Sequence, residues 1–148
     1  MSRRSVAAIE TARFEAHRWI DETCDALGTV DREYGLLAIR AVLHALRDRL
    51  TLEQSAHFSG HLPLLFGGIY FENWNPNARP TRDRTVGEFA ERVRHTLSGI
   101  PEREALRIVA VVFGVLQRNL VAGECGHGVQ RRADDFASEW DLGSPCGR

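Results

Sequence analysis

Apolar residues along this chain recur mostly at the three- and four-residue spacing of α-helices, and strand-like alternation is hard to find. Ser5, Asp31 and Pro63 are residues that commonly cap or open helices. Gly28 suits the end of a helix. The spacing predicts helices over about 5–26, 31–50, 51–60, 63–71, 85–97 and 101–120, followed by a last helical segment over about 123–140. The pattern therefore predicts an all-α protein.

Two capping boxes support these boundaries. Thr51 stands three residues before Gln54, and Thr85 stands three residues before Glu88. Between 73 and 84 the chain holds two prolines, three asparagines and three arginines, a composition typical of a loop. We expect this segment to be the one long loop.

Two of the predicted helices have unusual apolar patterns. The segment 106–120 is apolar nearly all round, which is typical of a helix at the centre of a bundle. A buried strand over 108–115 is the alternative, but the polar residues on both flanks favour a helix. In the first helix the apolar and small residues are spread too widely for one narrow stripe: Ile9, Ala12, Phe14, Ala16, Trp19, Ile20 and Thr23.

A shift of seventy positions aligns two stretches of the chain. Leu46 falls on Leu116, Leu50 on Leu120, His57 on His127, Phe66 on Phe136 and Tyr70 on Trp140. Such self-similarity predicts a repeated helical unit whose copies pack against each other. We therefore expect a single-domain bundle of six or seven helices: an N-terminal helix (1–27), a first repeat (31–74), a loop (75–84), a connecting helix (85–100), a second repeat (101–141) and a frayed tail (142–148).

The charge balance weighs against a polyanionic partner. Nineteen basic residues face 20 acidic ones in 148 residues, and no third of the chain is distinctly basic or acidic. Nucleic-acid binders usually carry a basic excess that neutralises phosphates, so we do not expect nucleic acid as a partner. All basic residues are arginine, which excludes a Schiff-base lysine and a phosphate-binding P-loop.

The cysteines and the apolar runs indicate the compartment. Cys24, Cys125 and Cys146 are far apart in sequence and predict no disulfide framework, which fits a reducing cytosol. The longest apolar run, 108–116, is too short to span a bilayer. Charged residues interrupt the N-terminal segment, so it does not read as a signal peptide. We expect a cytoplasmic protein without a membrane partner.

Three segments carry a resemblance to a known family. They are Arg40-Ala-Val-Leu-His-Ala-Leu-Arg-Asp-Arg-Leu50, His61-Leu-Pro63 and Gly68-Ile-Tyr-Phe-Glu-Asn-Trp74. Over roughly 34–140 the chain resembles the bacterial family called domain of unknown function 2267. The resemblance implies an all-α fold of two related helical halves in a bacterial cytoplasmic protein, with no established activity. His61 and Asn73 stand where the family usually has glutamine and glycine, and Arg132-Ala133 replaces Leu-Pro in the second copy.

The candidate metal ligands are Glu53, His57 and His61, which recur every four residues and so share one helical face. If the two repeats pack as partners, His127 and Cys125 complete a tetrahedral set for a transition metal. The alternative interpretation is that these histidines are solvated side chains on a polar face, at a point where the helix is ending. No other cofactor is implied.

No recognised catalytic motif is present, so we expect a noncatalytic protein. Cys125 and His127 are near enough in sequence to suggest a nucleophile and its base. We favour the simpler interpretation that Cys24 and Cys125 are small buried side chains.

Tyr70, Phe71 and Trp74 are candidate partner-binding residues beside the long loop. Adjacent positions on a helix point about 100° apart, so we do not expect Tyr70 and Phe71 to be equally buried. Core packing and pinning of the loop is the interpretation that we favour over partner binding.

Arg79, Arg82 and Arg84 form the one local basic cluster, and Arg92 and Arg94 follow it. A phosphate or nucleic-acid contact is one interpretation. A solvated loop with arginines paired to nearby acids is the favoured one, because the overall charge is balanced.

Together these observations predict a noncatalytic helical module that binds a protein partner or self-associates as a homo-oligomer. A metal- or small-ligand-binding protein that uses the histidines is the alternative. A nucleic-acid contact through the arginines is the third and weaker hypothesis.

Overall fold

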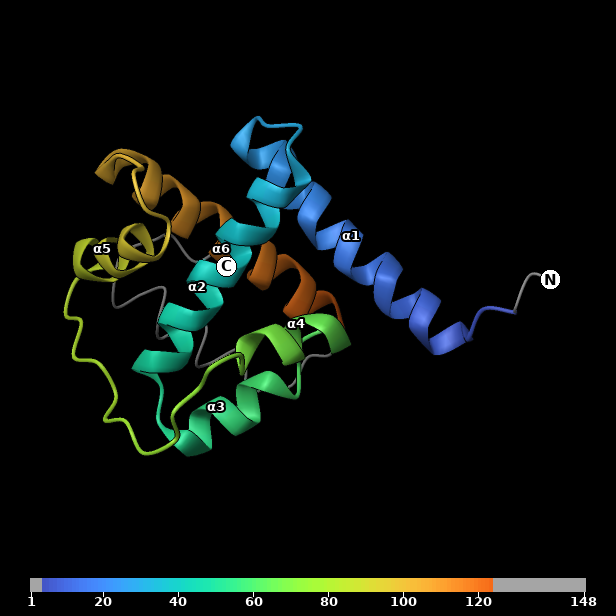
Figure 1. Cartoon of the computed structure of the whole chain (residues 1–148), viewed down its shortest axis with the longest axis horizontal. Helices are drawn as coiled ribbons and strands as arrows, with labels where there is room; N and C mark the ends of the chain where they lie inside the picture. Colours follow the sequence, from blue (N-terminus) through green and yellow to red (C-terminus); the bar gives the residue numbers. More distant parts are fainter. Residues whose placement is uncertain (1–3, 124–148) are drawn as a thin grey trace.

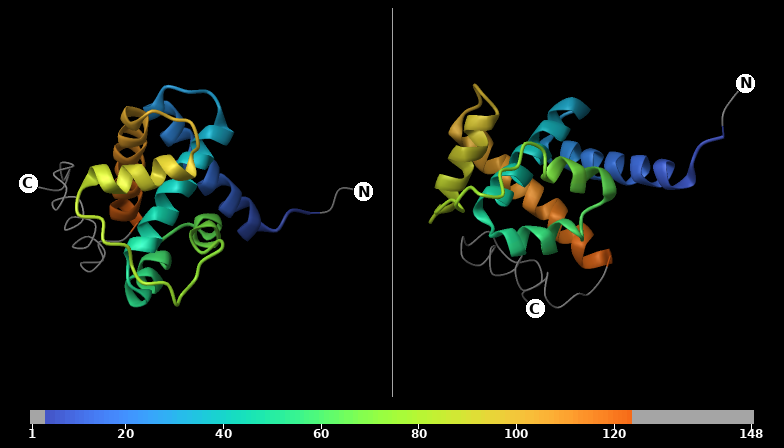
Figure 2. Two further views of the ribbon diagram at one scale, coloured as in Figure 1. Left: turned by 60° about the vertical axis from the view of Figure 1, so that its left-hand side comes forward. Right: turned by 60° about the horizontal axis from the view of Figure 1, so that its bottom comes forward.

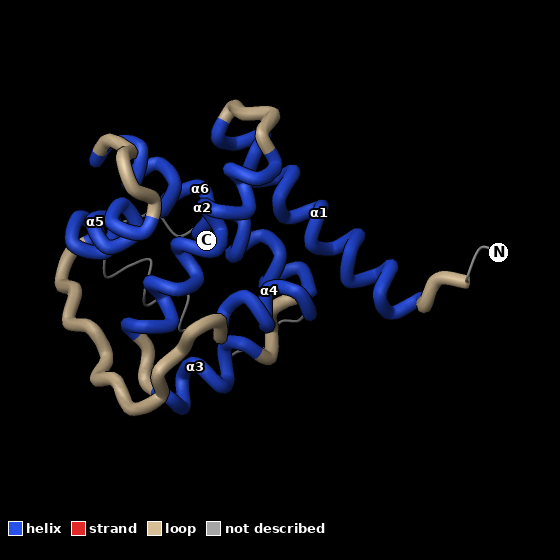
Figure 3. Tube along the Cα trace, viewed as in Figure 1, coloured by secondary structure: helices blue, strands red, loops and turns tan. Residues whose placement is uncertain are grey.

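Six α-helices, and no strand, form the part of the chain that the computed structural model describes, residues 4–123 (Figure 1; Figure 3). The helices are α1 (Ala7–Leu27), α2 (Arg32–Arg49), α3 (Leu52–Ser59), α4 (Leu64–Tyr70), α5 (Val86–Thr96) and α6 (Glu102–Gly123). The predicted all-α class is confirmed. The last helical segment and the tail that the sequence predicts lie outside the described residues. None of the described helices is long and apolar enough to cross a membrane.

Most helix starts follow the predicted capping. The Asp31 carboxylate accepts hydrogen bonds from the backbone of Glu33 and Tyr34, and Thr51 forms its complete capping box with Gln54. Gly28 ends α1 in the left-handed conformation, with φ of 73°.

One predicted cap is wrong, and one predicted capping box is only half formed. The residue that precedes α1 is Val6 rather than Ser5, because the Ser5 hydroxyl instead donates to the Glu10 carboxylate. At the start of α5 the Thr85 side chain accepts from the backbone of Glu88 as expected. The Glu88 carboxylate, however, accepts from the Arg84 backbone, one residue before the N-cap, so the second box is only half formed.

The core lies where α2 and α6 cross (Figure 1; Figure 2). Both α1 and α5 pack against this crossed pair. α4 adds a further contact to α1 and α2. The alternative strand over 108–115 is excluded, because this segment lies in the middle of α6. Ile108, Val109, Val112 and Val115 are all buried there. Burial offsets the slightly low helix propensity of these β-branched residues.

Burial in the second half of the described chain repeats that of the first half at a distance of seventy residues. In α2 and α6 the buried pairs are Gly35/Ala105, Ala38/Ile108, Ile39/Val109, Val42/Val112, Ala45/Val115 and Leu46/Leu116. In α1 and α5 they are Trp19/Phe89, Ile20/Ala90 and Thr23/Val93. This register is the one that the sequence predicts for a duplication. The two-repeat organisation as a whole stays a prediction, because much of the second copy lies outside the described residues.

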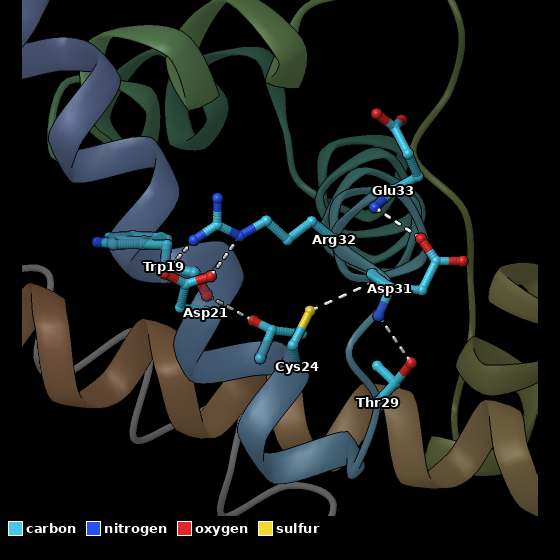
Figure 4. Close-up of polar contacts among 8 residues, drawn as sticks. Trp19, Asp21, Cys24, Thr29, Asp31, Arg32 and Glu33 are labelled. Atoms are coloured by element: carbon cyan, nitrogen blue, oxygen red, sulfur yellow. Dashed lines mark hydrogen bonds and ion pairs between the residues drawn. The ribbon is translucent and has the colours of Figure 1, made fainter.

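The corner between α1 and α2 is fixed by polar contacts (Figure 4). The Arg32 guanidinium forms two hydrogen bonds with the Asp21 carboxylate, at 2.9 and 3.0 Å. The buried Cys24 thiol lies 3.5 Å from the Asp31 carbonyl oxygen, to which it donates. Burial raises the pKa of this thiol, and Asp21 raises it further. Cys24 is therefore a buried structural thiol, as the sequence interpretation favoured.

Candidate functional site

The long loop forms an arch whose two ends are tied to the last turn of α2. At one end the Arg47 guanidinium donates to the carbonyl oxygens of Tyr70 and Glu72, at 3.3 and 2.5 Å. At the other end the Thr81 backbone N–H donates to the Asp48 carbonyl oxygen at 2.8 Å. We call residues 73–81 the arch. Because both ends are held, the arch spans the end of α2 at a fixed position.

A pocket of about 560 Å³ lies between the arch, the end of α2 and the start of α3. Its volume lies within the range of small-molecule sites. The lining residues are Arg47, Asp48, Leu50, Thr51, Leu52, Asn73, Trp74, Asn75, Pro76, Ala78, Arg79, Pro80 and Thr81. The structure thus brings Trp74 and Arg79 together, although the sequence placed them in two separate candidate sites.

The three candidate aromatic residues differ in burial. Tyr70 is completely buried, and its hydroxyl forms a 2.9 Å hydrogen bond with the Ser55 hydroxyl. Burial raises the pKa of Tyr70 to about 12. Phe71 and Trp74 are half-buried, so the expected difference between Tyr70 and Phe71 is confirmed. Tyr70 is thus a core residue, and Phe71 and Trp74 are the two of the three that reach the surface.

The histidine cluster is only partly described. Glu53 and His57 are exposed and His61 is half-buried, with the two imidazole rings 5.3 Å apart. No three histidine, cysteine, aspartate or glutamate side chains converge as a metal site within residues 4–123. His127 and Cys125 lie outside the described residues. The five-ligand metal site therefore stays a prediction.

The arginine cluster divides into exposed and paired side chains. Arg79, Arg82 and Arg84 are exposed and form no ion pair with other described residues. Arg92 makes two hydrogen bonds with the buried Asp83 carboxylate, at 3.0 and 3.1 Å, and these bonds raise the pKa of Arg92. Arg94 pairs with Glu91 and also donates to the Ile100 carbonyl oxygen. The pairing of arginines with nearby acids that the sequence favours thus holds for these last two.

Two residues of this region escaped the sequence interpretation. Arg47 is buried, and the Asp48 carboxylate accepts a 2.9 Å hydrogen bond from its Nε. Arg47 lies one turn after Leu43 on the apolar face of the predicted helix, and a charged residue on such a face indicates a buried, paired side chain. His44 is half-buried with Nε2 2.7 Å from the Ile69 carbonyl oxygen. Its pKa is lowered mainly by burial.

A second surface lies where α1 extends past the rest of the molecule (Figure 1; Figure 2). Ile9 and Phe14 in this projecting half are 62% and 69% exposed. Leu64 and Leu65 of α4 are exposed too, and α4 packs beside α1. We call these four residues the apolar corner. Ile9 lies on the same helical face as the buried Ala12 and Ala16, so the core-facing stripe of α1 continues beyond the core.

These features define a small all-α domain with an arch-covered pocket and an apolar helical projection. The chain belongs to the family of uncharacterized conserved proteins DUF2267, whose family model matches residues 16–132. The match begins inside α1, earlier than the resemblance in the sequence suggested. No curated protein matches this chain significantly.

Proposed function

We propose that this protein is a noncatalytic helical module that self-associates through the projecting half of α1. The observation that carries this proposal is the exposure of Ile9 and Phe14, two large apolar side chains on a helical segment that extends beyond the core. A short helical segment with few tertiary contacts is only marginally stable in water. A partner that covers its apolar side chains stabilises both the helix and the assembly.

The projecting half is an addition to the part of the chain that resembles the family. The match to the family begins at Ala16. α5 begins at Val86, the position seventy residues after Ala16, so α5 has no counterpart of the first turns of α1. Apart from the buried Ala12, residues 7–15 therefore belong neither to the packing shared by α1 and α5 nor to the part that the family model matches. An interface between molecules is a role that accounts for such an addition.

The charges on this segment favour a second copy as the partner. Glu10 and Arg13 lie 3.6 Å apart on one side of the helix. In an antiparallel contact centred between Thr11 and Ala12, Glu10 of each copy lies opposite Arg13 of the other. The same arrangement places Ile9 and Phe14 at the two edges of the contact, flanking the charged pairs. A surface that is complementary to itself in this way suits a closed two-fold dimer.

The apolar corner supplies the remaining contact area. Leu64 and Leu65 lie on α4, beside the point where α1 leaves the body (Figure 2). Exposed apolar side chains that gather in one region mark interaction surfaces more often than scattered ones do. Val30, by contrast, is fully exposed in the short connection between α1 and α2, away from this corner.

Sedimentation analysis over about a hundredfold range of concentration tests the proposal. We expect the wild-type chain to dimerise and the Ile9→Ser/Phe14→Ser variant to be monomeric. Val30→Ser is the control, because it removes an even more exposed apolar side chain elsewhere, and it should dimerise like the wild type. Both variants should unfold in urea at the same midpoint as the wild-type monomer.

A charge exchange tests the antiparallel arrangement. Glu10→Arg should weaken the dimer, because it places like charges opposite each other across the interface. Glu10→Arg/Arg13→Glu should restore it, since each new charge again faces its opposite. A wild-type chain that stays monomeric throughout, or a dimer that survives Ile9→Ser/Phe14→Ser, overturns the proposal. A dimer that forms only when zinc is added and disappears with a chelator also overturns it, in favour of the histidine site.

A further inference from the structure

We propose that the pocket under the arch binds a small aromatic monoanion, such as an aryl carboxylate. The proposal is independent of self-association, because the pocket and the apolar corner share no residue. It rests on three properties of the pocket: a fixed shape, an oriented aromatic wall and one uncompensated positive charge.

The shape of the pocket is fixed by contacts on both sides. The arch is tied to α2 through Arg47 at one end and through Thr81 at the other. Within the arch the Asn75 side chain accepts a hydrogen bond from the Asn77 backbone, and the Ala78 backbone donates to the Asn75 carbonyl oxygen. Pro76 and Pro80 restrict the backbone further. A pocket held open in this way loses little conformational entropy when a ligand enters.

The aromatic wall is Trp74, whose ring is oriented by a chain of ring contacts from the core. The buried Tyr70 ring meets the Phe71 ring edge to face, with centroids 5.0 Å apart. The Phe71 and Trp74 rings are also 5.0 Å apart. Leu50, Leu52 and the two prolines add apolar lining. A planar apolar ligand therefore finds an indole ring held in place and further apolar surface around it.

The charge of the pocket is set by three side chains. Arg47 is buried and compensated by the Asp48 carboxylate at 2.9 Å. Arg79 lines the same pocket and forms no ion pair with other described residues. The lining thus carries a net charge of +1, which matches a single carboxylate better than a phosphate dianion. The N-cap and the first residue of α3, Thr51 and Leu52, also line the pocket.

A matched pair of probes, 2-naphthoate and neutral 2-naphthamide, tests the proposal. Binding is measured by calorimetry and by the shift of the Trp74 indole N–H resonance, which the Trp74→Leu spectrum assigns among the three tryptophans. We expect the wild-type chain to bind the carboxylate about fivefold more tightly than the amide, as for one partly exposed charge pair. Arg79→Gln should abolish that preference and leave amide binding unchanged.

Two variants serve as comparisons. Arg82→Gln removes an exposed arginine of the same loop that does not line the pocket, and it should retain the preference for the carboxylate. Trp74→Leu should weaken the binding of both probes, because it removes the aromatic wall. If Arg79→Gln and Arg82→Gln lose the preference for the carboxylate equally, the attraction comes from the general charge of the loop, and the proposal is overturned. Binding that leaves the Trp74 resonance unshifted, or that disappears in Ile9→Ser/Phe14→Ser, places the probe elsewhere and also overturns it.

Discussion

The Tyr34 hydroxyl donates a 3.1 Å hydrogen bond to the Glu104 carboxylate, and these two residues are seventy positions apart. They occupy the same position in α2 and in α6, directly before the buried Gly35 and Ala105. Corresponding residues meet in this way where two similar elements cross near a two-fold axis. Arg107 extends the contact, because it donates to Glu104 and to the Leu27 carbonyl oxygen that ends α1.

Removing the Tyr34 hydroxyl should destabilise the protein modestly. Tyr34→Phe keeps the ring and loses one hydrogen bond to a charged group, which typically costs about 1.5 to 3 kcal/mol when buried and less at a half-buried site such as this one. A double-mutant cycle with Glu104→Gln, measured by urea unfolding, should show that the two effects are coupled. Strictly additive losses would contradict a direct interaction between the two side chains.

The buried Trp19 should tolerate phenylalanine far better than alanine. Its ring stacks on Phe66 at 5.2 Å, while its indole N–H has no hydrogen-bond partner within the described residues. Trp19→Phe keeps the stacking and removes a buried unsatisfied donor, so we expect a change within about 1.5 kcal/mol. Trp19→Ala should cost about 3 to 5 kcal/mol. Phe89 is buried at the corresponding position in α5. Urea titrations measure both variants, and equal losses of stability in Trp19→Phe and Trp19→Ala would refute the prediction.

A methyl group at position 35 should separate α1 from α2. A Cβ atom at Gly35 would lie 2.5 Å from the Cys24 sulfur, well inside contact distance. We expect Gly35→Ala to cost about 1 to 3 kcal/mol, although alanine favours a helix more than glycine does. Cys24→Ala removes the obstructing sulfur, so the double variant should be more stable than the two single losses predict. Thermal unfolding of the four proteins measures this, and a double variant that shows the full sum of both losses would count against the close contact.

The stability of the protein should fall as His44 becomes protonated. Burial lowers the pKa of His44 in the folded chain, so the unfolded chain binds a proton more readily. The stabilisation is therefore present above the unfolded pKa of about 6.5 and is lost as the pH falls through that value. His44→Gln should reduce the loss of stability between about pH 7.5 and about pH 5.5, measured by urea unfolding. His95→Gln removes an exposed histidine and should leave the pH dependence as in the wild type. Identical pH dependence in the wild type and His44→Gln would disprove the role of His44.

Local sequence signals predicted the helices well because their causes are local. Asp31 and Thr51 cap helices with side-chain oxygens that reach backbone groups two or three residues away, so the sequence contains all that is needed. Ser5 does not cap α1, because its hydroxyl donates instead to the Glu10 carboxylate, five residues further on. Glu88 likewise had two backbone groups within reach, and which of them it meets depends on the exact path of the chain before α5.

The candidate site was only partly predictable, for a different physical reason. Trp74 and Arg79 both stood out in the sequence, but their shared pocket depends on where the arch is tied to α2. Arg47 makes that connection. Its place on the apolar face of the predicted helix indicated burial, but its partners are carbonyl oxygens more than twenty residues away, which the sequence does not reveal. The spacing of Glu53, His57 and His61 predicts one shared helical face, but α3 ends at Ser59, so His61 lies beyond the helix. Spacing alone does not decide which further ligands meet these side chains.

The sequence by itself determined the all-α class, nearly every helix boundary and the seventy-residue register, because capping and helical periodicity act over a few residues. The tertiary structure decided which apolar residues are buried. Ala16 is buried and Ile9, on the same face of α1, is exposed, since only part of α1 has α2 and α6 beside it. It also decided that the arch encloses a pocket and that Tyr34 meets Glu104, because both depend on segments distant in sequence that pack together only when the whole core forms.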